Sequence, residues 1–172
     1  MLTTAELPDA VKTLGRLADD LADAVKESEK TTDDLYDLIT YLRTDDLVPV
    51  ADMAEAMGRD RNYIDSTWSD SQAHGDSADP AWFGLTGDDS PETLLAKLAE
   101  ISEAQLAAKE RVTTLRNARN ALVAQVYASR LMGPVAIAKE IGVKCNQVLR
   151  IVKKQGVAPV HRTKIRNQYS AK

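Results

Sequence analysis

The sequence predicts an all-α protein with two tri-helical units that are related by an internal repeat, each preceded by a long helix with a heptad pattern. Three observations lead to this prediction. Apolar residues recur at alternating steps of four and three, the chain matches itself after a shift of 84 residues, and only 5% of the residues are aromatic while Ala, Leu and Val are abundant.

The first long helix is expected within residues 1–30. Thr31, Thr32 and Asp33 then offer side chains that can cap a new helix, so the first tri-helical unit is expected at residues 31–68, with a break at Asp45–Pro49. The heptad stripe of the long helix consists of Leu7, Val11, Leu14, Ala18, Leu21 and Val25.

Residues 69–90 are rich in Gly, Ser, Asp and Pro and are predicted to be a linker. Its residues Trp82, Phe83 and Leu85 are too apolar for a purely solvated tether. We expect them either to dock onto a helical domain or to form a motif that binds a partner.

A second long helix is expected at residues 91–117, because Ser90 is a good N-cap and Pro91 suits the first helical position. The sequence does not decide whether this helix bends near residues 117–120 or continues to about residue 130. The two heptad stripes can pack against each other within one chain, or they can join two chains in a homodimer. The second stripe consists of Leu94, Leu98, Ile101, Gln105, Ala108, Val112 and Leu115.

Charge divides the chain sharply. Residues 1–100 contain 8 Lys/Arg and 23 Asp/Glu, a net charge of −15, whereas residues 101–172 contain 14 Lys/Arg and 3 Asp/Glu, a net charge of +11. The basic part can attract a polyanion that the acidic part would repel. The two parts are therefore expected to have different partners.

The 84-residue shift aligns residues 37–68 with residues 121–152 without a gap. Five identical pairs and a shared apolar pattern support two related tri-helical units. The identical pairs are Leu38 and Leu122, Leu47 and Leu131, Ala54 and Ala138, Gly58 and Gly142, and Asn62 and Asn146.

The second unit, at residues 118–156, combines a small residue, a glycine and a set of apolar residues: Ala138, Gly142, Ile137, Ile141, Val143, Val148 and Ile151. Over about 35 residues this pattern resembles the tri-helical, homeodomain-like helix-turn-helix superfamily. The resemblance implies that two helices cross at Ala138, that Gly142 stands in the turn with a positive φ, and that Val148 and Ile151 anchor the second helix. The resemblance implies that the second helix of this unit enters the major groove of double-stranded DNA.

The residues that the resemblance assigns to DNA carry suitable chemistry. Arg can grip guanine through two acceptors, Asn or Gln can pair with adenine, and Lys suits phosphates. The basic arm at residues 157–172 can add backbone or minor-groove contacts, or it can be a frayed tail. The predicted DNA-binding residues are Lys144, Asn146, Gln147, Arg150, Lys153 and Lys154 in the unit, and Arg162, Lys164 and Arg166 in the arm.

The first unit is an acidic, degenerate version of the same pattern. Arg59 replaces the apolar residue of the turn, and Asp60 and Asp65 would repel phosphates. Two interpretations stay open: a second DNA site that uses Arg61, Asn62 and Tyr63, or a surface within residues 1–68 that binds a protein partner.

Catalysis and metal binding are not expected. One cysteine, Cys145, and two histidines, His74 and His161, provide neither a nucleophile with its base nor a zinc motif, and no Gly-rich phosphate loop occurs. No cofactor is predicted. Because no apolar run reaches the length of a membrane span and no secretory signal begins the chain, we expect a cytoplasmic protein without a membrane partner.

The sequence thus predicts a non-enzymatic, sequence-specific double-stranded DNA-binding protein, such as a transcriptional regulator or repressor. Its composition and tandem layout look like those of proteins of actinobacterial phages and mobile elements. Two alternatives remain: a DNA-packaging or partition adaptor with oligomerising helices, and a protein-interaction module that uses the acidic part.

Overall fold

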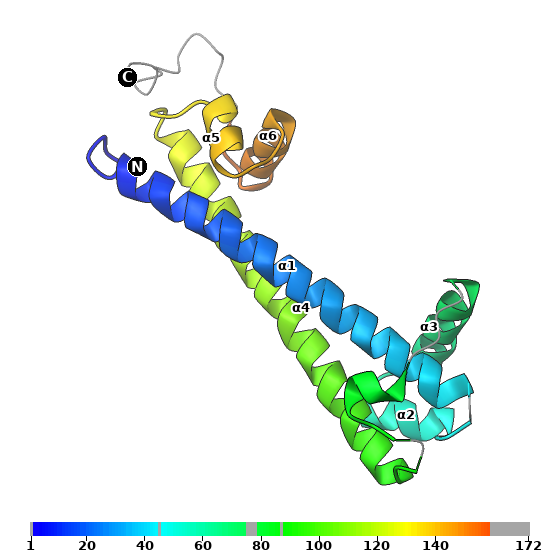
Figure 1. Ribbon diagram of the computed structural model, residues 1–172. Helices are drawn as coiled ribbons and strands as arrows, with labels where there is room; N and C mark the ends of the chain where they lie inside the picture. The colour runs from blue at the N-terminus through cyan, green and yellow to red at the C-terminus, as the bar shows by residue number, and fades with distance from the viewer. Residues whose placement is uncertain (1, 45, 75–78, 87, 159–172) are drawn as a thin grey trace. The chain divides into compact units, whose positions relative to one another are not determined.

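A computed structural model describes residues 2–44, 46–74, 79–86 and 88–158 (Figure 1). This part of the chain is helical and contains no strand, which confirms the predicted all-α class. The elements are α1 (Leu7–Thr44), α2 (Val50–Ala56), α3 (Arg61–His74), the 3₁₀ helix η1 (Pro80–Phe83), α4 (Pro91–Ala128), α5 (Pro134–Glu140) and α6 (Cys145–Lys154).

The helix start predicted at Thr31 is wrong, because α1 continues without interruption to Thr44. The hydroxyl groups of Thr31 and Thr32 donate hydrogen bonds to carbonyl oxygens one turn earlier, those of Glu27 and Ser28. Threonine can satisfy its hydroxyl in this way inside a helix as well as at an N-cap, so its presence does not by itself mark a helix start.

The predicted start of the second long helix is confirmed, since α4 begins at Pro91. The Ser90 hydroxyl oxygen accepts a hydrogen bond from the backbone N–H of Thr93 at 3.3 Å, as expected of an N-cap serine. The helix extends to Ala128 as one element, beyond the predicted boundary at residue 117. Ala, Leu and other good helix formers predominate in this segment, and no Gly or Pro occurs between Pro91 and Gly133, which explains this length.

By its internal contacts the chain forms two compact units. Unit 1 comprises residues 1–24 and 111–172 and so includes the second predicted tri-helical segment, residues 118–156. Unit 2 comprises residues 25–110 and includes the first one, residues 31–68. In unit 1 the first part of α1 contributes Leu7 and Leu14 to a core that it shares with the end of α4, α5 and α6. The other buried residues of this core are Ala10, Val123, Val126, Tyr127, Met132, Ile137, Ala138, Ile141, Val148 and Val152.

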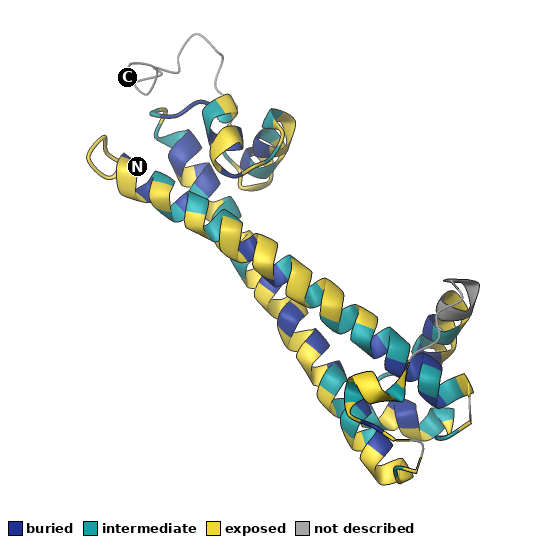
Figure 2. Ribbon diagram, in the orientation of Figure 1, coloured by how far each residue is buried: buried dark blue, intermediate teal, exposed yellow. Residues whose placement is uncertain are grey.

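In unit 2 the last part of α1 packs beside the first part of α4, with α2 and α3 completing the core (Figures 1 and 2). Leu85 is buried in this core and Phe83 packs against it. The apolar residues of the predicted linker therefore dock in part, whereas Trp82 remains 69% exposed. Buried α1 and α4 residues here are Leu35, Leu38, Ile39, Leu42, Leu94 and Leu98.

Four buried positions in unit 2 are polar, namely Thr40, Thr67, Ser102 and Gln105, and one of them joins the two long helices. Gln105 on α4 is fully buried, and its Nε2 atom donates a hydrogen bond of 3.4 Å to the hydroxyl oxygen of Thr32 on α1. Its Oε1 atom has no hydrogen-bond partner among the described residues. The helix pair of unit 2 is thus joined by an amide–hydroxyl contact within a mainly apolar core.

The helix bounds follow the 84-residue shift. Adding 84 to the bounds of α1 and α2 gives those of α4 and α5, and adding 84 to the first residue of α3 gives the first residue of α6. The turns also correspond: Asp46 and Arg130 are both non-glycine residues with positive φ, at 50° and 61°, and Gly58 and Gly142 have φ of 60° and 66°.

Within the described residues, no helix is both long enough and apolar enough to cross a lipid bilayer.

Candidate nucleic-acid interface

The turn between α5 and α6 has the predicted geometry. Gly142 adopts a φ of 66°, and the next backbone N–H, that of Val143, donates to the carbonyl oxygen of Ala138 at 3.0 Å. Ala138 is buried between the two helices, together with Ile137 and Ile141. The short apolar interior predicted for this segment is therefore present, and it fixes the direction in which α6 leaves the turn.

Two valines, Val148 and Val152, are fully buried and hold α6 onto the core of unit 1. We predicted Ile151 as the second anchor, but Ile151 is only partly buried. At 3.6 residues per turn, a residue four positions on is rotated by about 40° from the first, whereas one three positions on is rotated by about 60°. Val152 therefore lies closer than Ile151 to the line of Val148.

The opposite side of α6 is exposed (Figure 2). Its exposed residues include four cations when the N-cap residue Lys144 is counted. Asn146, Arg150 and Lys153 follow one another at steps of four and three, so they share one face. Because no Asp or Glu occurs from residue 141 to residue 158, nothing on this helix offsets its cations. The predicted residues with exposed side chains are Lys144, Asn146, Gln147, Arg150, Lys153 and Lys154.

Gln147 differs from the other predicted residues because its side chain already has a partner. Its Oε1 atom accepts a hydrogen bond of 3.0 Å from the backbone N–H of Lys144, the N-cap residue of α6. An amide at the third helical position that reaches back in this way satisfies one of the backbone donors at the helix start.

The part of unit 1 that follows residue 110 carries further positive charge, whereas its residues 1–24 contain five acids and two cations. From residue 111 to residue 158 the sequence has one acid, Glu140, and its carboxylate lies toward α1, where a Cβ atom on Gly15 would be 3.5 Å from Oε1. Arg130 and Lys139 are further exposed cations in the same unit, which the sequence interpretation did not include. The basic composition of this part of the chain was the available signal.

One arginine of unit 1 is partly buried rather than exposed. Arg119 on α4 donates from Nη2 to the side-chain oxygen of Asn120 at 3.1 Å. Desolvation, together with the neighbouring Arg116 cation, lowers the pKa of the Arg119 guanidinium from its usual value.

In unit 2 the residues of the predicted second DNA site start α3. Arg61 and Asn62 are exposed, but Tyr63 is half-buried. The guanidinium of Arg59 lies 5.2 Å from the ring centre of Tyr63, a distance that allows a cation–π contact. Asp60 caps the helix, since its carboxylate accepts the backbone N–H of Tyr63 at 2.9 Å.

A second carboxylate of α3, that of Asp65, forms an ion pair with Arg43 of α1 at 2.9 Å. The same guanidinium lies 5.1 Å from the ring centre of Trp68. Arg43 is therefore committed to contacts within unit 2, and it links the end of α1 to α3.

The exposed residues of α6 and α3 can be compared position by position through the 84-residue shift. Asn146 corresponds to Asn62, so the amide is kept. The four cations of α6 correspond to no cation in α3. Lys144, Arg150, Lys153 and Lys154 correspond to Asp60, Ser66, Ser69 and Asp70, respectively.

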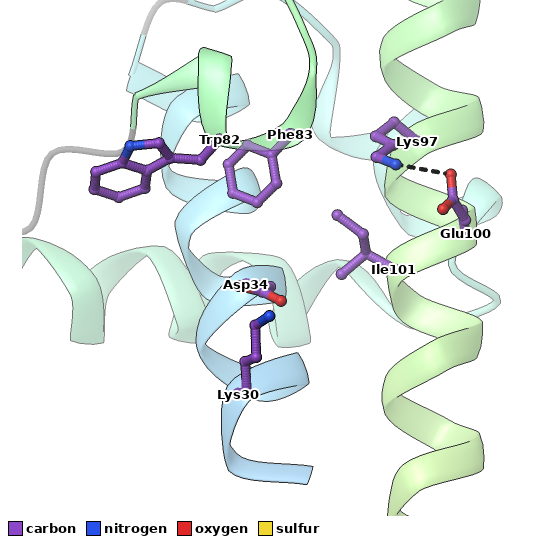
Figure 3. Close-up of a pocket in the computed structure, with 7 residues that line it drawn as sticks. All are labelled: Lys30, Asp34, Trp82, Phe83, Lys97, Glu100 and Ile101. Carbon is purple, nitrogen blue, oxygen red and sulfur yellow. Dashed lines mark hydrogen bonds and ion pairs between the residues drawn. The ribbon is translucent and has the colours of Figure 1, made fainter. Parts of the chain in front are cut away.

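Unit 2 also contains an open cleft of about 470 Å³. Figure 3 shows Phe83 facing the cleft between two helices, with an ion pair of 3.0 Å between Lys97 and Glu100 on one side. The lining combines aromatic and aliphatic surface with two basic and two acidic side chains. The lining residues are Lys30, Asp34, Trp82, Phe83, Lys97, Glu100 and Ile101.

The predicted arm residues Arg162, Lys164 and Arg166 lie outside the described residues. In the part of the chain that is described, no group of His, Cys, Asp and Glu side chains is placed to hold a metal ion. Comparisons of the chain with protein-family models, with curated proteins and with solved structures found no match.

Proposed function

We propose that the protein is a sequence-specific double-stranded DNA-binding protein, such as a transcriptional regulator or repressor, that reads the major groove with α6. One observation carries this proposal. A helix held by two buried valines, Val148 and Val152, presents four cations and exposed amides on its outer side with no acid among them.

The dimensions and chemistry of this surface suit a DNA duplex. The major groove is wide enough to admit one α-helix, and its base edges offer acceptors to Arg150 and a donor–acceptor pair to Asn146. Lys144, Lys153 and Lys154 are suited to the flanking phosphates. Phosphate contacts fix the register of the helix, and base contacts select the sequence.

We also propose that α5 and α6 form a helix-turn-helix and that the chain contains two related tri-helical units. The left-handed glycine, the buried alanine and the correspondence of helix bounds after 84 residues support this interpretation. In this proposal, unit 2 keeps the architecture of a DNA reader but not its charge.

Binding to a duplex, measured by fluorescence anisotropy at several salt concentrations, tests the proposed function. The full chain should bind, and its affinity should fall steeply with salt because phosphate contacts release counterions. Lys153→Ala combined with Lys154→Ala should weaken binding and flatten the salt dependence. Lys12→Ala combined with Lys26→Ala, which removes the same charge from α1, is the matched control and should change little.

No binding at low salt, or an equal loss from both double variants, would contradict a DNA interface on α6.

A protein partner for unit 2 is a second candidate function. The cleft beside the exposed Trp82 and the excess of acidic residues in residues 1–68 favour it. This function can coexist with DNA binding by α6, as in a packaging or partition adaptor.

A homodimer remains an alternative, although the heptad residues Leu7, Leu14 and Leu98 are already buried within one chain. A measured molecular mass in solution separates a monomer from a dimer or a larger ring.

A further inference from the structure

Two neighbouring amides at the start of α6 are in different states. The Oε1 atom of Gln147 accepts the backbone N–H of Lys144 at 3.0 Å. The side chain of Asn146 is exposed and has no hydrogen bond within the described residues. From the sequence alone, both side chains could read a base equally well. Their contacts in the structure distinguish them.

Recognition of adenine by an amide uses both of its polar atoms. The oxygen accepts from the N6 amino group of the base, and the nitrogen donates to N7. While Gln147 caps α6, its amide oxygen is turned back toward the backbone of Lys144, so the amide cannot present both of its polar atoms to one base edge. Reading adenine would break the cap and expose one of the orphan backbone donors at the helix start.

We infer that Asn146 and Arg150 are the base-reading pair of α6, and that Gln147 is a positioning residue that fixes the first turn. Asn146 and Arg150 are four residues apart on one exposed face, so their side chains lie one above the other. The inferred target is a duplex in which an adenine contacted by Asn146 and a guanine contacted by Arg150 lie within a few base pairs.

Gln147 acts on DNA through Lys144 in this assignment. By holding the backbone N–H of Lys144, it fixes the backbone from which the Lys144 side chain extends toward a phosphate. Its loss should weaken binding to every sequence by the same factor, because a phosphate contact carries no sequence information.

The inference depends on the proposed DNA binding, and one experiment separates the two. The full chain, Asn146→Ala and Gln147→Ala are each used to select bound duplexes from a random pool, and affinities for the selected duplexes are then measured. Asn146→Ala should lose its preference at one base pair, by about tenfold to a hundredfold. Gln147→Ala should keep every base preference and bind all duplexes a few-fold more weakly.

Thermal unfolding provides the readout that does not depend on DNA. Gln147→Ala should unfold at a lower temperature than the unaltered chain, whereas Gln147→Glu, which keeps an acceptor for the cap, should not.

The outcomes are distinct. If the unaltered chain selects no sequence, the proposed function itself fails. If it selects a sequence but Gln147→Ala changes a base preference, or Asn146→Ala changes none, then DNA is bound and the assignment of the reading pair is overturned. Unfolding of Gln147→Ala at an unchanged temperature would also overturn the positioning role.

Discussion

The two short-helix pairs, α2–α3 and α5–α6, have the same helix bounds after a shift of 84 residues, except that α3 is longer at its C-terminal end, but they have opposite surface charge. Corresponding positions in the two interiors are both apolar and buried. Met53 and Ile137 are fully buried, and Ala54 and Ala138 are both buried at the corner between the helices. Backbone geometry and apolar spacing therefore determine the fold of each pair, while the outward positions determine what can bind there.

The starts of α3 and α6 also differ in the residue that caps the helix. In α3 the N-cap residue Asp60 accepts the N–H of Tyr63, and in α6 the third helical residue, Gln147, accepts the N–H of Lys144. Each helix uses one half of a reciprocal capping arrangement. The choice places a carboxylate at the start of α3 and an ammonium at the start of α6, which suits only α6 to phosphates.

The most severe test is to give α6 the surface of α3. Lys144→Asp, Arg150→Ser, Lys153→Ser and Lys154→Asp together should lower duplex affinity by about a thousandfold, because phosphate contacts are lost and two repelling carboxylates are added. The fold should persist, since Asp is a good N-cap and the other changes lie on exposed positions. Anisotropy titration measures the affinity, and circular dichroism checks the helix content. Retained affinity would mean that α6 is not the interface.

The shared interior can be tested by shortening the equivalent residues Met53 and Ile137. Each change to Ala should lower the free energy of unfolding by about 2–5 kcal/mol, because a fully buried side chain leaves a cavity. Chemical denaturation followed by circular dichroism measures both variants. A small loss in one unit only would show that the two interiors are packed differently.

The corresponding glycines should also behave alike. Gly58→Ala and Gly142→Ala should each cost about 1–2 kcal/mol, since the left-handed conformation strains an L-residue and no neighbouring atom lies within 4 Å of the added Cβ. The cost is conformational rather than steric, so the two values should agree. Thermal and denaturant unfolding provide the comparison, and a clear difference between the positions would contradict equivalent turns.

Loss of the α3 cap is expected to have the smallest effect on stability among these changes. Asp60→Ala should lower stability by about 1 kcal/mol, whereas Asp60→Asn, which keeps an acceptor, should be close to neutral. Denaturant midpoints measure both. Equal destabilisation by the two variants would indicate that the charge of Asp60, and not its hydrogen bond to Tyr63, is what matters.

Local signals were predicted well from the sequence. The turn glycine Gly142, the corner residue Ala138 and the helix start at Ser90–Pro91 each depend on the conformation of a few adjacent residues. The exposure of the cations on α6 followed from helical spacing against its apolar residues.

Features that depend on alternative partners were not predicted. The hydroxyls of Thr31 and Thr32 could cap a new helix or bond within an existing one, and only the tertiary structure selects the second state. The engagement of Gln147 as a cap depends on its rotamer, which spacing does not reveal. Ile151 and Val152 are adjacent apolar residues, and a small rotation of α6 decides which of them is buried.

The contact between Gln105 and Thr32 also limits how the two long helices of unit 2 can align. A slip by one heptad in either direction would put Val25 or Ile39 opposite the amide, and neither side chain can accept or donate a hydrogen bond. The displaced amide would be enclosed by hydrocarbon with both polar atoms unpaired. A single glutamine thus gives the leucine-rich seam one preferred alignment, which repeating leucines by themselves do not provide.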